Sequence, residues 1–277
     1  MNKNILNTPN RSFSLKKKIG LVYKSIILFS LSLFLSAAEG AEFDILSQSI
    51  STIREKAESG DPYYQAVLGV YLRTGENGIK IDFKESEKWS ALSAEKQNAL
   101  GLTNMGSLLM EKRNIPKANF YYQEAFLNRG LLKLVENKDP IAAYCLGVIY
   151  SESEPKDYNK AVKYFRISAT SGFSTAQAIL SSMYFIGMGI PSNIEEGIKF
   201  ARLAANKKSA IGRFNMGVAY SLGQGIEKNN SKAFKLLHLA SEQGFPQAQL
   251  TLGMIYIRGQ GTPKDYTKAV QCFQKAY

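Results

Sequence analysis

The sequence predicts an all-α protein, an α-solenoid of stacked antiparallel helix pairs. One phrase occurs twice near the end of the chain: the stretch that begins at Ile211 returns from Gln247, at an offset of 36 residues. A Leu-Gly pair, or a close variant of it, also recurs along the chain. The second residues of these pairs, called markers from here on, are Gly69, Gly106, Gly147, Ser181, Gly217 and Gly253. Self-similarity at a fixed period of this length is the signature of a stacked repeat.

The first half of a unit has the pattern of a helix. In the last unit, Ala248, Leu252, Gly253 and Tyr256 fall at i, i+4, i+5 and i+8, on one helical face. Glycine inside a helix costs about 1 kcal/mol relative to alanine. Its repetition therefore predicts that the paired helix approaches the marker too closely to leave room for a side chain.

The second half of a unit follows a turn and is again helical. Gly259-Gln260-Gly261 ends the first helix, and the second helix begins near Asp265. Two such helices cannot bury their apolar faces alone, so each unit must stack on its neighbours. Residues 61–277 divide into six units, near 61–97, 98–130, 139–172, 173–208, 209–244 and 245–277.

One junction between units is irregular. The closing residue of a unit lies nine residues before the next marker, but Gly130 lies seventeen residues before Gly147. The extra stretch, residues 131–138, contains neither Gly nor Pro. We expect it to be helical and to extend the preceding helix; a hinge is the alternative.

Residues 39–60 are predicted to form a capping helix ahead of the array. Ile45, Ile50, Ile53 and Ala57 make one apolar side of this helix. It would cover the first unit, as terminal elements of repeat proteins do.

Residues 1–38 have the features of a signal peptide. Lysines occupy 16–18, an apolar run covers 26–35, and small residues precede an expected cleavage between Ala38 and Glu39. The apolar run is about half of the roughly 20 residues that a membrane span requires. Export to the periplasm or secretion is therefore expected, with membrane association only if the segment stays uncleaved.

The charge of the chain does not indicate a nucleic-acid partner. The full sequence has a net charge of +12, but residues 1–38 hold six of its Lys and Arg and no acid, which leaves +6 for the rest. Nucleic-acid binding calls for clustered basic patches. No long run of like charges follows residue 18, so no nucleic acid is expected to bind.

These units resemble the Sel1-like repeat family, a relative of the tetratricopeptide repeats. The Leu-Gly pair, the Tyr three residues later, the Gly-x-Gly turn and the Lys-Ala pair are all present, most completely in the last two units. Unit two lacks the Gly-x-Gly turn, unit three has SESEPKD in its place, and unit four has Gly197 at an alanine position. The resemblance implies a right-handed solenoid of about six Sel1-like repeats with a concave groove.

Residue types that support catalysis or metal binding are scarce. The single histidine, His238, cannot form a ligand cluster. Cys145 and Cys272 lie three units apart and are expected to be unpaired core residues. Two Ser-x-x-Lys stretches lack the companion motifs of β-lactamases and penicillin-binding proteins. No catalytic residue, metal or cofactor is predicted. The alternative is a cell-wall enzyme of that type, as described for cysteine-rich Sel1-like proteins.

The concave groove is the predicted binding site for a partner. The position two residues before the marker holds Asn104 and Asn215, and Asn is a poor residue inside a helix. By resemblance to tetratricopeptide arrays, which present an asparagine to bound peptides, these amides and the nearby Arg213 are candidate contacts for a protein or an extended peptide. The alternative is that each amide bonds to the neighbouring helix.

Together these features predict an exported bacterial scaffold that binds a protein or a peptide. It would act in the cell envelope or at the interface with a host. Val270 and Phe273 lie on a last helix that no further unit follows. Self-association through this helix is therefore also expected, because exposed apolar ends of solenoids tend to pair.

Overall fold

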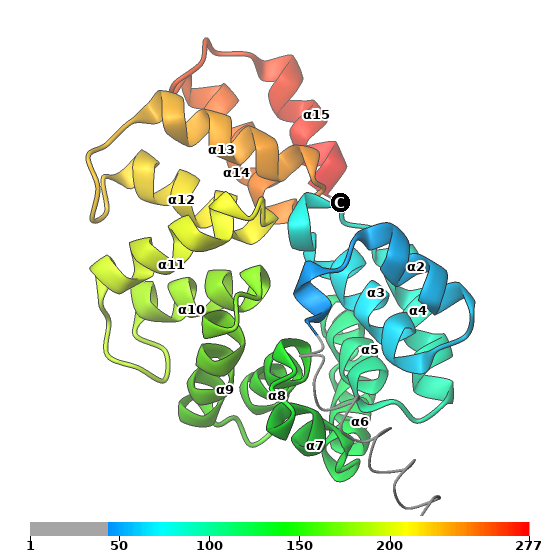
Figure 1. Cartoon of the computed structure of the whole chain (residues 1–277). Coiled ribbons are helices and arrows are strands. Elements are labelled where there is room, and N and C mark those ends of the chain that lie inside the picture. The colour runs from blue at the N-terminus through cyan, green and yellow to red at the C-terminus, as the bar shows by residue number, and fades with distance from the viewer. Residues whose placement is uncertain (1–43, 277) are drawn as a thin grey trace, which may run out of the picture. The chain divides into compact units, whose positions relative to one another are not determined.

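The structure, a computed structural model, describes residues 44–276, and within them the chain forms only helices and connecting turns. The cap consists of a 3-10 turn, η1 (Ile45–Ser47), and α2 (Ile50–Glu58). The first helices of the six units are α3 (Pro62–Thr74), α5 (Ala99–Glu111), α8 (Pro140–Glu152), α10 (Ser174–Ile186), α12 (Ala210–Leu222) and α14 (Pro246–Arg258). The second helices are α4 (Phe83–Glu95), α6 (Ile115–Leu127), α9 (Tyr158–Thr170), α11 (Ile194–Asn206), α13 (Asn230–Glu242) and α15 (Tyr266–Ala276). The pairs follow one another in chain order (Figure 1), which confirms the predicted α-solenoid.

A common turn joins each unit to the next and sets the period. The residues nine before each marker have positive φ; they are Gly60, Gln97, Lys138, Gly172, Lys208 and Gly244. The following residue donates its N–H to a carbonyl five residues earlier, as Asp61 does to Lys56 and Ser209 to Ala204. This hydrogen bond belongs to the Schellman motif that ends helices. Because each second helix ends in this way, the next first helix begins at a fixed distance.

At the irregular junction the closing residue also lies nine residues before the next marker, once the extra helix is assigned to the second unit. This helix, α7, covers Gly130–Glu136. Lys138, with φ of 61°, lies nine residues before Gly147 and therefore closes the second unit in place of Gly130. Asn128 has an extended backbone, which separates α6 from α7. The stretch is helical, as expected, but the expectation that it extends the preceding helix is wrong.

Every marker glycine except Gly69 lies where a large side chain of the second helix approaches the first; Gly69 lies against the hydroxyl of Ser90. A Cβ atom built on Gly147 would lie 2.6 Å from the ring of Phe165, and one on Gly253 would lie 2.5 Å from the ring of Phe273. Close packing leaves no room for such an atom unless the ring moves. The close approach that the glycine pattern predicted is confirmed.

Unit four reverses this arrangement. Its marker, Ser181, is fully buried, and its second helix has Gly197 at the position where later units have Ala. The ring of Phe185, on the first helix, lies 2.6 Å from a Cβ atom built on Gly197. The large side chain thus comes from the first helix in this unit, so the serine and the second-helix glycine compensate each other.

The cap is shorter than predicted and is broken near its start. Ser49 begins α2 by accepting a hydrogen bond from the N–H of Thr52, and η1 precedes it. Ile45, Ile53 and Ala57 are fully buried, and α2 packs against α3. The cap therefore covers unit one. The earlier part of its predicted range, residues 39–43, lies outside the described residues.

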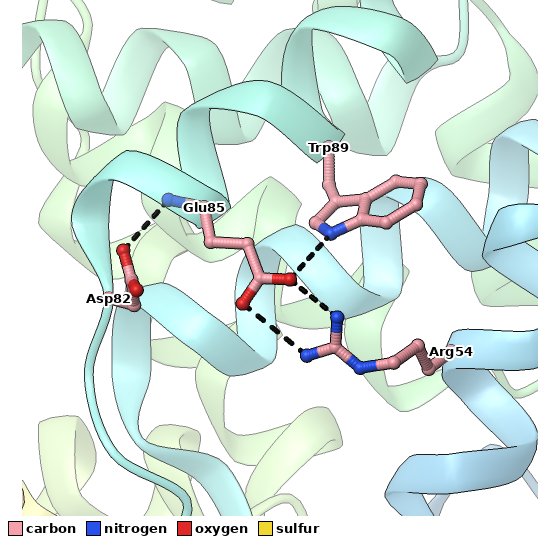
Figure 2. Close-up of polar contacts among 4 residues, drawn as sticks. All are labelled: Arg54, Asp82, Glu85 and Trp89. Carbon is pink, nitrogen blue, oxygen red and sulfur yellow. Dashed lines mark hydrogen bonds and ion pairs between the residues drawn. The ribbon is translucent and has the colours of Figure 1, made fainter.

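An ion pair fixes the cap to the second helix of unit one. In Figure 2, Arg54 of α2 meets the carboxylate of Glu85 with two nitrogens, Nη2 lying 3.3 Å from Oε2. Trp89 donates from Nε1 to the same carboxylate at 3.2 Å, and Asp82 caps α4 by accepting from the N–H of Glu85 at 2.8 Å. The bonds from Arg54 and Trp89 lower the pKa of Glu85.

The hydrophobic core is continuous through the cap and the first four units. The first helices α3, α5 and α8 pack on one another as well as on their own second helices. The ring of Phe173, at the start of α10, lies 6.3 Å from that of Tyr71 and 5.2 Å from that of Tyr144. Tyr63 donates its hydroxyl to Asp139, the cap of α8, at 2.6 Å. Residues 45–209 are called the closed block from here on.

Units five and six have smaller cores. One small cluster includes Met216 and Ala219 with residues of α11, and another lies between α14 and α15 around Leu252 and Cys272. Large apolar side chains such as Leu222 remain exposed. Residues 210–276 are called the open end from here on.

The predicted signal peptide, residues 1–38, and its cleavage between Ala38 and Glu39 lie outside the described residues. Within residues 44–276, no helix has both the length and the apolar content needed to cross a membrane. Export therefore stays a prediction.

Candidate functional site

The structure places Asn104 inside the closed block. Its side chain is 1% exposed and donates to the hydroxyls of Ser86 and Ser90, at 3.2 and 2.6 Å. Its Oδ1 accepts from Nε of Arg73 at 2.6 Å, and Arg73 in turn donates to the hydroxyl of Tyr144 at 2.7 Å. The amide of Asn104 thus joins α3, α4 and α5.

Asn215 has an equivalent position in unit five and also bonds to its neighbours. Its Nδ2 donates to the carbonyl of Ala178 at 2.9 Å and to the hydroxyl of Ser182 at 3.0 Å. Both acceptors lie on α10, so the bond joins the open end to the closed block. For both amides the geometry favours the alternative that they bond to a neighbouring helix. Their role in binding a partner stays a prediction.

Arg213 lies at a position that other units use for a contact between helices. Four residues before the marker, Gln65, Gln177 and Gln249 each donate to a carbonyl near the end of the preceding helix, which is the cap helix α2 for Gln65 and a second helix for the other two. Arg213 occupies this position in unit five and donates to Oε1 of Gln243 at 2.7 Å. Its role in binding a partner also stays a prediction.

The remaining chemistry-bearing residues are used structurally. Cys145 and Cys272 are buried and free, as predicted, and burial raises the pKa of both thiols. In the Ser-x-x-Lys stretches, Ser93 and Ser153 donate their hydroxyls to backbone carbonyls. Within the part of the chain that the structure describes, no three His, Cys, Asp or Glu side chains are grouped as metal ligands.

An open cleft lies at the irregular junction between units two and three. At the other unit junctions the second helix packs closely on the next first helix, but here α7 packs on α8 and α6 has few contacts with α8. A cavity of about 860 Å³ results, here called the junction cleft. It is lined mainly by Tyr122, Phe126, Leu127, Tyr150 and the segment 153–160, which includes the first turn of α9.

The walls of the junction cleft are aromatic. The rings of Tyr150 and Tyr164 are stacked at 5.6 Å, and Phe126 meets Tyr150 edge-on at 5.8 Å. Nζ of Lys160 lies 5.2 Å from the centre of the Tyr150 ring and pairs with Asp157 at 3.1 Å. Burial raises the pKa of Tyr150, so its hydroxyl is neutral at physiological pH and can donate a hydrogen bond.

Apolar side chains lie open beside this aromatic cluster. Phe126 is 48% exposed and Leu127 is 74% exposed, and both line the cleft. Contact between large apolar side chains and water is unfavourable. Neighbouring apolar side chains that stay exposed are therefore typical of a protein–protein contact site. The insertion was visible in the sequence. The cleft was not, because it depends on α7 being separate from α6.

A family comparison identifies the repeats. The model of the Sel1 repeat matches residues 62–98, 97–128, 140–173, 174–209, 210–245 and 246–277. The chain belongs to the Sel1 repeat family. The inserted helix α7 lies between the second and third matched Sel1 repeats, so the junction cleft lies where the succession of Sel1 repeats is interrupted.

Solved structures of Sel1 repeat proteins are similar to this chain. A Sel1 repeat protein from Oxalobacter formigenes is 29% identical with a TM-score of 0.49; the match covers 82% of this chain and 64% of that one. A protective antigen of uropathogenic Escherichia coli with an SLR fold is 25% identical with a TM-score of 0.44, and the match covers 83% and 48% of the two chains. This chain thus spans less than two-thirds of either. No curated protein matches the sequence at a significant level.

Sel1 repeat proteins generally mediate protein–protein interactions. In this Sel1 array the junction cleft offers a surface of the kind that protein partners use, because apolar and aromatic side chains line it together with polar residues of segment 153–160. Such a surface can bury apolar side chains of a partner and orient them by a few hydrogen bonds.

Proposed function

We propose that this protein is an exported bacterial scaffold and that its partner protein binds at the junction cleft. The observation that carries the proposal is the exposed apolar surface of α6 beside an aromatic cavity. Burial of Phe126 and Leu127 by a partner would contribute favourably, at about 25 cal/mol per Å² of apolar area removed from water. The cell envelope and the host interface are both settings in which such a scaffold would act.

Site-specific photo-cross-linking tests where the partner binds. Leu127 ends α6 and is 74% exposed, whereas Leu222 ends α12 and is 67% exposed, so the two positions are matched in residue type, exposure and place at the end of a helix. A photoreactive amino acid at Leu127 should trap the partner in cells, and one at Leu222 should not. Phe126→Ala should reduce the cross-link from position 127. Equal trapping at both positions, or no effect of Phe126→Ala, would contradict the proposed site.

Export and its destination need separate measurements. Intact-mass analysis of the periplasmic or secreted protein should give a chain that begins at or near Glu39. Full-length protein that begins at Met1 and floats with membranes would instead identify an anchored protein. Fractionation with and without host cells then separates an envelope scaffold from a host-directed one.

Self-association through the last helix is the second partner contact that we propose. Tyr266 is 65% exposed and Val270 is 53% exposed on α15, while Ala269 and Cys272 of the same helix are buried against α14. Val270→Lys should reduce any dimer seen by sedimentation velocity. A monomer at high concentration without a partner would count against this contact.

A further inference from the structure

The loop between the two helices of unit one leaves its own unit and reaches later ones. This loop, residues 75–82, is one residue longer than the corresponding loops 187–193, 223–229 and 259–265. In those loops the second glycine packs against the preceding unit, as Gly189 does on Tyr158. In unit one, Gly78 instead lies against Lys208, at the end of unit four.

Glu76 makes the central contact of this loop. Its Oε1 accepts from the N–H and the hydroxyl of Ser174, at 3.1 and 2.8 Å. Its Oε2 accepts from the N–H and the hydroxyl of Thr175, at the same two distances. The carboxylate is 1% exposed and both partners are fully buried. It therefore satisfies four donors at the start of α10, which lies 98 residues further along the chain.

The start of α10 lacks a capping residue of its own. The cap position is Phe173, whose side chain makes no capping bond, whereas α3, α5, α8 and α12 are capped by Asp61, Asn98, Asp139 and Ser209. A helix start leaves its first N–H groups without partners unless a side chain or water supplies acceptors. Glu76 supplies them here, and its negative charge is favourable at this end of a helix.

Two further contacts hold the same loop in place. The N–H of Ile81 donates to the carbonyl of Gln243 at 2.8 Å, which ties the loop to the end of unit five. Ile81 is buried, and Gly75 lies against Ala210 at the start of α12. The loop is thus attached to units four and five at separate points.

We propose that residues 75–82 form a clasp that locks unit one onto units four and five, with Glu76 as its latch. Repeat arrays ordinarily have contacts only between neighbouring units. The clasp adds a contact across three units, so the first units unfold together instead of fraying one at a time. Opening the clasp is the step that would separate unit one from unit four.

Removal of the latch tests the clasp. Glu76→Ala should lower the thermal midpoint by roughly 5–10 °C, because four buried donors lose their acceptor. The matched control is Glu227→Ala, which removes an exposed acid from the corresponding loop of unit five and should shift the midpoint by about 1 °C or less. Equal midpoints for the two variants would overturn the proposal.

Hydrogen exchange adds a readout that a general loss of stability would not give. In Glu76→Ala the amides of Ser174, Thr175 and Ile81 should exchange on the order of 10-fold faster or more, while amides in the middle of α10 change less. If Glu76→Ala does not fold, the wild type still decides, since the amides of Ser174 and Thr175 should exchange together with the slowest amides of α3 in one common opening. Opening of Ser174 and Thr175 at a lower free energy than α3 in the wild type would contradict the clasp.

A small carboxylate can replace the missing side chain. Acetate should raise the thermal midpoint of Glu76→Ala by several degrees more than the same concentration of chloride, and it should leave the wild type and Glu227→Ala unaffected beyond the salt effect. Acetate that does no more than chloride would show that the start of α10 does not bind a carboxylate, and the latch would be rejected.

Discussion

The closed block and the open end are built from the same repeat but differ in how they are held together. In the closed block, one core runs through the cap and four units. In the open end, the buried apolar residues form two small clusters that are separate from that core. The open end, however, has the two units that match the repeated phrase most completely.

The comparison indicates that the regular repeat pattern and the cooperativity of unfolding depend on different residues of this chain. A regular unit has the residues that pack against its neighbouring units and few others. One departure from the pattern, the lengthened loop that contains Glu76, makes long-range contacts with units four and five, and another, the inserted helix α7, opens the junction cleft. The irregular units are therefore expected to be the more stable part.

The largest expected effect comes from removing a ring at equivalent positions in the two regions. Phe173 is fully buried, and Phe245, at the same position in unit six, is only half-buried. Phe173→Ala should lower the free energy of unfolding by about 3–5 kcal/mol, the range for truncating a buried aromatic residue. Phe245→Ala should cost about 1–2 kcal/mol, because less area is lost. Urea unfolding measures both, and equal costs would remove the distinction between the regions.

A smaller effect separates the marker glycines. Gly147→Ala requires the ring of Phe165 to move, and this ring is 1% exposed in the closed block. Overpacking there should cost about 1–3 kcal/mol. Gly253→Ala meets the ring of Phe273, which is partly exposed and can move towards solvent, so its cost should be below about 1 kcal/mol. Thermal unfolding of the two variants measures both costs. A larger cost for Gly253→Ala than for Gly147→Ala would contradict this prediction.

Asn215→Ala tests the contact between the two regions and the predicted binding role together. Loss of the bonds to Ala178 and Ser182 should cost about 1 kcal/mol of stability and loosen α12 from α10. If Asn215 contacts the partner instead, affinity for the cross-linked partner falls by a similar amount while the melting temperature is unchanged. Measuring affinity and melting temperature on one variant decides between the two roles.

The smallest effect is the pH dependence of the ion pair that fixes the cap. The pKa of Glu85 is lowered from its ordinary 4.5 by Arg54, so its contribution is present above pH 4.5 and is lost as pH falls through the lower folded pKa. Because the pair is partly exposed, Glu85→Gln should cost at most about 1 kcal/mol at pH 7 and less at pH 2. A cost that is the same at both pH values would exclude the ion pair as its source.

The repeat itself could be predicted from the sequence because it rests on local spacing. The markers, the turn glycines and the Ala positions repeat within a single unit. The orientation of Asn104 and Asn215 was harder to predict. A helix of a solenoid is packed against its own partner and against the next unit, so the face opposite the marker is also buried; the apolar Val67 and Cys145 at the same position were a signal of this.

Contacts between distant loops had no local signal. Glu76 replaces the Met188, Gln224 or Gln260 of the corresponding loops, and one extra residue follows. These differences mark the loop as unusual, but which distant residues it contacts depends on the curvature of the whole block. The junction cleft likewise follows from the angle at which α7 leaves α6, which the composition of residues 131–138 does not determine.

Native-state hydrogen exchange across a series of low denaturant concentrations tests the central claim most directly. It resolves the free energy at which each helix opens. The slowest amides of α3, α5, α8 and α10 should share one high opening free energy, and those of α12 and α14 should open at lower values, α14 first. A single value for all six first helices, or a stepwise loss that begins at α3, would contradict the division into a closed block and an open end.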